Sequence, residues 1–231
     1  MKSCLAVFFV LLLPCQQANA GLISIGHVYQ FVTAEVHGDG LYDQDSLENS
    51  ALPISTDLQA HADGPIAPDG SATASSTQSV AINEFSSTVI DLSALMSTSG
   101  FVEGPVEGFT LGTSIFGLSF TIDTPFHYLI SGGGEVDGDG IFSISLSSKA
   151  TGTVFEVAGR GADEAEGLLS PGTWDVSARL ENGGAVPHSG NVSFSFKIDA
   201  PAQVPEPSSV ALLLLGGFGL VGYGWRKRRQ V

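Results

Sequence analysis

The sequence predicts an all-β protein, folded as a two-sheet sandwich with a jelly roll as one possible strand order. Apolar and polar residues alternate with a period of two in four separate segments, the pattern of strands with one buried and one solvated face. Breaks rich in Gly and Pro separate these segments at the spacing found in sandwiches. This body, residues 21–199, is expected between a cleaved N-terminal signal helix and a C-terminal transmembrane helix.

The first element, residues 1–20, has the composition of a secretory signal peptide. Lys2 supplies a positive region, residues 5–13 form an apolar region, and Ala18-Asn19-Ala20 is an A-x-A cleavage site before Gly21. We therefore expect the mature chain to begin at Gly21 and to be exported through the inner membrane.

The two cysteines of the chain bear on the same leader. A lipoprotein signal ending at Cys15 is the alternative to ordinary cleavage, but it requires a small residue where Pro14 stands. Cys4 and Cys15 both lie in the leader, so the exported chain contains no cysteine. The sequence therefore predicts no disulfide, no thiol catalysis and no cysteine metal site in the body.

The strands of the body are predicted with different clarity. Alternation is clearest at residues 116–122, 142–146, 174–180 and 191–199. Weaker strands are expected at residues 28–36, 80–85, 126–130 and 153–158. Only residues 92–96 and 163–169 have the pattern of a helical turn.

The segments between these strands have the composition of turns and loops. Residues 57–79, rich in Ala, Ser, Asp and Pro, predict a long loop or a poorly ordered insert. Residues 170–173, Ser-Pro-Gly-Thr, place Pro and Gly at the central positions of a type II turn. Glycine-rich breaks are expected at residues 132–134, 138–140 and 182–184.

The charge of the body is strongly negative. All 24 acidic residues lie between Glu35 and Glu206, and the same stretch holds four basic residues, which gives it a net charge of −20. Nucleic acid requires a basic face, so we expect no nucleic-acid partner. An acidic surface suits solubility outside the cell and permits divalent cations.

The titratable residues of the body form no recognisable catalytic motif. The five histidines are scattered without metal-ligand spacing, and the chain contains no H-E-x-x-H or G-x-S-x-G pattern. Carboxylates close in sequence carry little information in so acidic a chain. We therefore expect a protein that is not an enzyme.

One acidic segment has the spacing of a cation site. Glu135, Asp137 and Asp139 offer oxygen ligands at alternate positions, as in the first half of an EF-hand loop, but Leu146 stands where the closing glutamate belongs. Residues 37–45 form a second acidic, Gly-containing stretch. Solvated turns are the alternative for both, so we expect at most weak calcium binding at the three carboxylates and no other cofactor.

The C-terminal end reads as a membrane segment with a basic stop. Residues 208–225 carry no charge and span roughly 27 Å as a helix, near the lower limit for crossing a bilayer. Their glycines are tolerated in lipid, where the backbone must bond internally. The basic residues Arg226, Lys227, Arg228 and Arg229 predict a cytoplasmic C-terminus. A buried core helix is the alternative.

A short motif joins the body to this segment. Residues 200–203 form a linker extended by proline, and Val204-Pro205-Glu206-Pro207 follows. Two prolines flanking an acid hold a non-helical segment just outside the bilayer. With the apolar stretch and the basic end, residues 204–231 resemble the PEP-CTERM sorting signal of proteins exported by Gram-negative bacteria.

The resemblance implies a processing step performed by another enzyme. In that family an exosortase, a membrane-embedded enzyme resembling a cysteine transpeptidase, recognises the Pro-Glu-Pro motif and cleaves near it. Such processing accompanies extracellular polysaccharide and biofilm. It implies a body held transiently at the inner membrane and then delivered to the cell surface or beyond. An unprocessed single-pass anchored protein is the alternative.

Two classes of function remain open for the body. It is either a structural protein of the surface or extracellular matrix, associated with exopolysaccharide, or a lectin-like module that binds sugar directly. Trp174 and Tyr128 are the candidate stacking residues, although the alternation places Trp174 on the buried side of its strand. His127, of opposite parity to Tyr128, has no evident partner.

Overall fold

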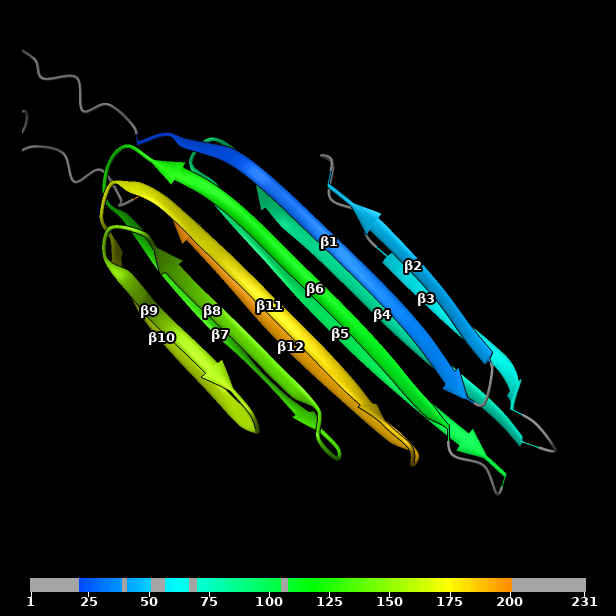
Figure 1. Cartoon of the computed structure of the whole chain (residues 1–231). Coiled ribbons are helices and arrows are strands. Elements are labelled where there is room, and N and C mark those ends of the chain that lie inside the picture. The colour runs from blue at the N-terminus through cyan, green and yellow to red at the C-terminus, as the bar shows by residue number, and fades with distance from the viewer. Residues whose placement is uncertain (1–20, 39–40, 51–56, 67–69, 105–107, 201–231) are drawn as a thin grey trace, which may run out of the picture. The chain divides into compact units, whose positions relative to one another are not determined.

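Antiparallel strands make up nearly all of the described residues, which are 21–38, 41–50, 57–66, 70–104 and 108–200 of a computed structural model (Figure 1). The predicted signal peptide and residues 201–231 lie outside these ranges. Within them, no helix has the length and hydropathy needed to cross a membrane.

The strands form two sheets of six, and every neighbouring pair is antiparallel (Figure 1). Sheet 1 has the order β2 (Leu41–Asn49), β1 (Ile23–Gly38), β6 (Phe109–Ile122), β11 (Gly172–Gly184), β8 (Ile141–Ser148) and β9 (Gly152–Ala158). Sheet 2 has the order β10 (Gly161–Leu169), β7 (Phe126–Val136), β12 (His188–Asp199), β5 (Val89–Glu103), β4 (Gly70–Phe85) and β3 (Asp57–Ile66). The all-β sandwich is thus confirmed, while the jelly roll stays a prediction.

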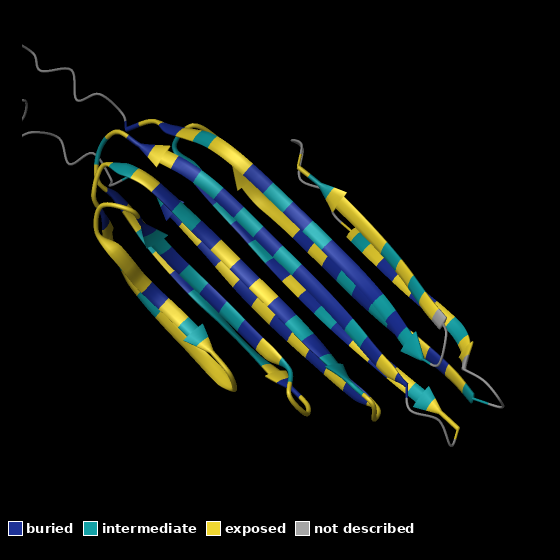
Figure 2. Ribbon diagram, in the orientation of Figure 1, coloured by how far each residue is buried: buried dark blue, intermediate teal, exposed yellow. Residues whose placement is uncertain are grey.

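The four clear segments are strands, and their apolar positions form most of the largest core. Burial alternates residue by residue along β6 and β11 (Figure 2). Phe120, Trp174 and Phe196 are all buried in this core. The four weaker segments also lie in strands, within β1, β4, β7 and β9. Period-two alternation was therefore sufficient to predict eight of the strands.

The prediction of a loop over residues 57–79 is wrong. Asp57–Ile66 is β3, and Gly70–Phe85 is β4. Every residue of β3 pairs with a residue of the segment 70–79 in β4. The alternation is present, but alanine occupies the inward positions: Ala60, Ala62, Ala72 and Ala74 are fully buried or nearly so. Alanine buries too little apolar surface to stand out from a polar background.

The two predicted helical turns are also strands. Residues 92–96 lie in β5, where Leu92 and Met96 are buried and Leu95 is exposed, so the segment has a strand period. Residues 163–169 lie in β10, at the edge of sheet 2 and paired with β7. Ala and Glu favour a helix locally, but tertiary pairing overrides this preference.

The glycine run at residues 132–134 lies inside β7 and is not a break. A Cβ atom at Gly132 would lie 2.6 Å from Ile144 Cδ1, and one at Gly133 would lie 2.5 Å from Ala162 Cβ. The glycines therefore serve close packing on both faces of the strand rather than a turn.

Residues 182–184 were likewise predicted as a break but end β11. Asn182 is fully buried between the sheets. A Cβ at Gly183 would lie 2.8 Å from the carbonyl oxygen of Thr110. Here too, glycine permits close approach of neighbouring atoms, and the chain leaves the strand only after Gly184.

Two other predicted breaks are confirmed. Residues 138–140 lie in the turn between β7 and β8, where Gly138 has φ +69°. Residues 170–171 lie between β10 in sheet 2 and β11 in sheet 1, and Gly172, the first residue of β11, has φ +142°. Both values lie in the region that glycine adopts most readily.

The start of the first strand and the residue after the last strand both bond to the same turn. The backbone N–H of Ile23 donates to Ser87 O at 2.6 Å, and the N–H of Ala200 donates to Thr88 O at 3.1 Å. These bonds hold the first strand and the exit of the last strand against the hairpin between β4 and β5. The chain therefore enters and leaves the sandwich at the same pole.

Candidate binding surfaces

One hollow, with a volume of about 860 Å³, lies on the outer face of sheet 2. Its floor is made of small outward-facing side chains, among them Ser93, Ser131 and Ser195, with Asp163 and Glu164 of β10 at one side. The hydroxyls of Ser131 and Ser195 are 2.9 Å apart. The hollow is open, and its serine hydroxyls and the Asp163 and Glu164 carboxylates offer hydrogen-bonding groups.

A second hollow, of about 610 Å³, contains two residues singled out from the sequence. His127 and Tyr128 line it together with Lys197, whose Nζ lies 3.6 Å from Asp199 Oδ2. Tyr128 also packs partly against the core. Trp174, the other stacking candidate, is buried, and its Nε1–H donates to Ser170 O at 2.9 Å. Trp174 is therefore a core residue.

The predicted calcium ligands lie at the end of β7. Asp137 accepts from Ser189 Oγ at 2.9 Å, and Glu135 lines a hollow of about 510 Å³ with Asp137 and Arg160. A guanidinium group thus already stands beside these carboxylates. In the part of the chain that the structure describes, no three His, Cys, Asp or Glu side chains are placed to hold a metal ion. Weak calcium binding stays a prediction.

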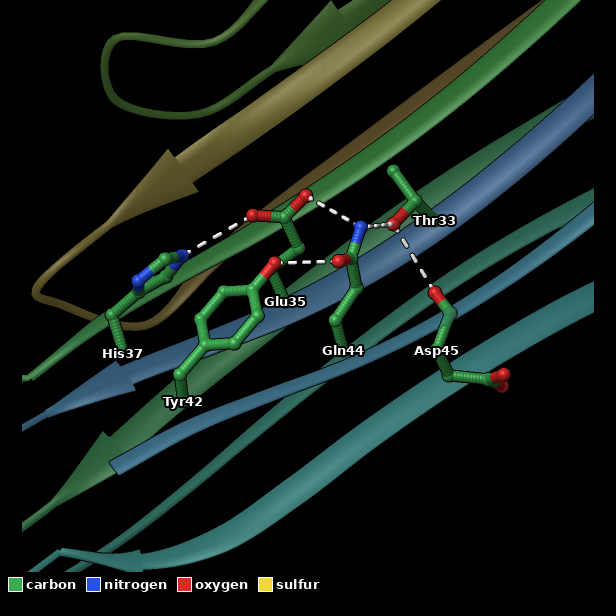
Figure 3. A network of polar contacts seen from close by, with 6 residues as sticks. All are labelled: Thr33, Glu35, His37, Tyr42, Gln44 and Asp45. Carbon is green, nitrogen blue, oxygen red and sulfur yellow. Dashed lines mark hydrogen bonds and ion pairs between the residues drawn. The ribbon is translucent and has the colours of Figure 1, made fainter. Parts of the chain in front are cut away.

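The second acidic stretch contributes to a polar network on the outer face of β1 and β2 (Figure 3). Glu35 Oε2 lies 3.2 Å from His37 Nε2, and Glu35 Oε1 accepts from Gln44 Nε2 at 3.2 Å. Tyr42 OH donates to Gln44 Oε1 at 2.5 Å. The ring centroids of His37 and Tyr42 are 4.7 Å apart. These bonds fix the aromatic rings at this end of β1.

Two carboxylates of the same stretch reach across to the other sheet. Asp45 Oδ2 accepts from the backbone N–H of His61 at 3.0 Å, and Asp43 Oδ2 accepts from the N–H of Asp63 at 3.1 Å. His61 and Asp63 belong to β3, the edge strand of sheet 2. The carboxylates thus satisfy donors that an edge strand otherwise presents to solvent or to another chain.

An aromatic row follows the outer face of β1 from its first residues. His27 and Tyr29 have ring centroids 6.4 Å apart with planes 23° from parallel. Tyr29 and Phe31 are 6.3 Å apart with planes 12° from parallel. Burial, and to a lesser degree the nearby Glu48 carboxylate, raise the pKa of Tyr29 above its usual value.

The sequence contained the signal for this row, although it was not recognised there. His27, Tyr29 and Phe31 alternate with Val28 and other inward residues of a strand that was predicted. Their odd parity places three rings on one solvated face. The signal therefore lies in the outward parity of the strand, not in the apolar parity that identifies its buried face.

Comparisons with known proteins bear on the tail more than on the body. No curated protein matches the chain. A solved structure described as TmCBM61 in complex with β-1,4-galactotriose matches with 10% identity and a TM-score of 0.25, covering 52% of this chain and 86% of that one. A likeness this slight carries no argument about fold or ligand. Residues 203–229 match the model of the PEP-CTERM protein-sorting motif, and the chain therefore carries that motif at its C-terminal end.

Proposed function

We propose that this chain is an exported surface or extracellular protein that an exosortase processes at its C-terminal sorting signal. The match of the PEP-CTERM sorting motif over residues 203–229 is the observation that carries the proposal. The proposal assigns the bond-breaking step to the exosortase and no catalytic step to this chain.

The two ends of the chain have complementary roles in this proposal. The leader directs export and is cleaved after Ala20, which leaves Gly21 as the first residue. Residues 208–225 span the inner membrane with residues 226–229 in the cytoplasm. Val204-Pro205-Glu206-Pro207 then lies extended outside the bilayer, where an exosortase reaches it. Processing releases the body from this temporary anchor.

The properties of the body suit a location outside the inner membrane. It is acidic and, after Gly21, free of cysteine. Its outer faces carry paired hydroxyls, such as those of Ser145 and Ser177 at 2.9 Å. We propose that the released body associates with exopolysaccharide or biofilm material at the surface. Direct sugar binding is the second candidate, and the aromatic row on β1 favours it.

The processing proposal is tested by following a tag placed after Gly21. We expect the product from a host with exosortase to lose the mass of the tail, and the product from an exosortase deletion strain to keep it. Glu206→Ala should block processing in the first host, whereas Glu84→Ala, at an exposed glutamate of β4, should not. A full-length, membrane-bound product in both strains contradicts the proposal and favours a permanent anchor.

The N-terminal residue of the same product tests the leader. Mass spectrometry should find Gly21 at the N-terminus. A lipidated Cys15 would instead show that the chain is a lipoprotein, with a different route of attachment.

A further inference from the structure

Three rings on β1 face outward with a regular spacing. Successive centroids of His27, Tyr29 and Phe31 are 6.4 and 6.3 Å apart, close to the two-residue repeat of about 6.6 Å in a strand. Their planes are nearly parallel from one to the next. An open row of equally spaced rings suits a ligand that repeats along its length better than one compact molecule.

Among the described residues, none pairs with His27 or Tyr29 on the β2 side of the row. The register of β1 with β2 begins at Gln30, and the described pairing of His27 and Tyr29 is with β6. The residue paired with Tyr29 on that side is Gly117, which has no side chain. His27 is exposed, and Tyr29 and Phe31 are half-buried. Gly117 therefore leaves a gap beside the central ring, between the side chains of Ser119 and Ile115.

Polar side chains lie beyond β6, on the next strand of the sheet. β11 pairs with β6 and places Asp175, Ser177 and Arg179 level with His27, Tyr29 and Phe31 in turn. The distance across two strands is about 10 Å. Arg179 is half-exposed and paired with Glu181. Carboxylate, hydroxyl and guanidinium groups together can accept from and donate to ligand hydroxyls.

We propose that this surface binds a linear, neutral polysaccharide, whose sugar rings stack on His27, Tyr29 and Phe31 while their hydroxyls reach Asp175, Ser177 and Arg179. The apolar C–H face of a sugar ring matches an aromatic face, and its hydroxyl edge matches the polar row. This inference deepens the sugar-binding candidate given above and rests on it.

The negative charge of the protein determines which polysaccharides it can bind. The stretch from Glu35 to Glu206 carries a net charge of −20, which repels polyanions such as polyuronates and nucleic acid. An apolar protein partner is less well matched, because Ile115 beside Phe31 is accompanied by Gly117, Ser177 and ionic side chains, which offer little apolar surface. A neutral chain of sugars has no charge to repel and uses both the rings and the polar groups.

The test measures binding of neutral oligosaccharides to the full chain in detergent. Cellohexaose, xylohexaose and mannohexaose are titrated by calorimetry, with oligogalacturonate as the acidic counterpart. At least one neutral oligosaccharide should bind more tightly than oligogalacturonate. Tyr29→Ala should weaken that binding about tenfold, and Tyr29→Phe should change it little because the ring remains. Phe101→Ala, an exposed aromatic on sheet 2, should leave binding unchanged.

A second variant guards against a folding defect. His27→Ala removes an exposed ring and should weaken binding about threefold with an unchanged thermal midpoint. The proposal is overturned if no neutral oligosaccharide binds at millimolar concentration, or if Tyr29→Ala and His27→Ala bind as the parent does. Equal or tighter binding of oligogalacturonate also overturns it. Normal tail processing without sugar binding removes this inference alone, and sugar binding without processing removes the exosortase proposal alone.

Discussion

The two hydrophobic cores of the sandwich differ in the size of their side chains. The larger core contains Phe120, Trp174, Phe196 and other aromatic and aliphatic residues from both sheets. The smaller core lies between β1 and the β3–β4 hairpin, with Leu58 and Val102 partly buried against it. Its buried side chains, among the described residues, are valines and alanines: Val32, Val36, Ala34, Ala60, Ala62, Ala72 and Ala74. Both cores follow the same period of two, so side-chain volume rather than pattern distinguishes them.

Side-chain volume changes what holds the sheets together. Beside the small core, Ser76 Oγ of sheet 2 donates to Thr113 O of sheet 1 at 2.7 Å, a bond that requires close approach of the sheets. A Cβ at Gly112 would lie 3.1 Å from the backbone oxygen of Ser75. Inter-sheet hydrogen bonds and backbone contact thus replace bulky packing there. We therefore expect loss of side-chain volume to destabilise the protein most in the large core. Added volume should destabilise it most beside the small core.

Truncation in the large core should have the greatest effect. Phe120 is fully buried, and its ring centroid lies 5.7 Å from that of Phe196 with the planes tilted by 40°. Phe120→Ala should lower the free energy of unfolding by about 3–5 kcal/mol, through lost burial and a residual cavity. Phe101→Ala, at an exposed phenylalanine, should change it by less than about 0.5 kcal/mol. Urea unfolding measures both, and similar losses would show that Phe120 does not lie in a packed core.

Addition of one methyl group should distinguish the close-packed region. Gly112→Ala places a Cβ 2.9 Å from Thr98 Cβ and should cost about 1–3 kcal/mol. Gly117 lies on the outer face of the same strand, where a Cβ would meet nothing closer than 3.8 Å. Gly117→Ala should be neutral or stabilising, because alanine has less conformational entropy to lose. Equal effects of the two changes on the thermal midpoint would contradict close approach of the sheets at Gly112.

Two buried glutamines lie at the boundary between the cores, and the coupling energy between them can be measured. Gln30 of β1 donates through Nε2 to Gln78 Oε1 of β4 at 3.2 Å, and both side chains are buried. Gln78→Met should cost about 1–2 kcal/mol because it removes a buried partner. A double-mutant cycle with Gln30→Met should give a coupling of about 0.5–1.5 kcal/mol. Additive single effects would mean that the two glutamines act independently.

This contrast explains which parts of the fold the sequence revealed. The large side chains of residues 116–122 and 174–180 made the strand period visible, and both segments are strands. The period of Ala60, Ala62, Ala72 and Ala74 is just as regular, but alanine is common in loops, so β3 and residues 70–79 of β4 were predicted as a loop or insert. β10 contains good helix formers and becomes a strand only through its pairing with β7.

The candidate sites divide in a similar way. The sorting motif is a contiguous pattern, so the residues alone were sufficient to predict it. The aromatic row lies within β1 alone, and the alternation that turns its residues to one face is visible in the sequence. Its polar counterpart on β11 lies about 150 residues further along the chain and depends on the pairing of β6 with both strands, a pairing that no spacing in the sequence specifies.

The smallest change in the free energy of unfolding is expected at edge strand β3, beside the small core. There we expect substitutions to change self-association more than stability. Asp43→Ala removes the acceptor 3.1 Å from the N–H of Asp63 and should cost about 0.5–1 kcal/mol. Asp43→Asn keeps an acceptor oxygen and is the matched control. Because the freed donors lie on an edge strand, Asp43→Ala combined with Asp45→Ala should increase concentration-dependent association, measured by light scattering. Unchanged scattering would contradict a protective role of the two carboxylates at this edge.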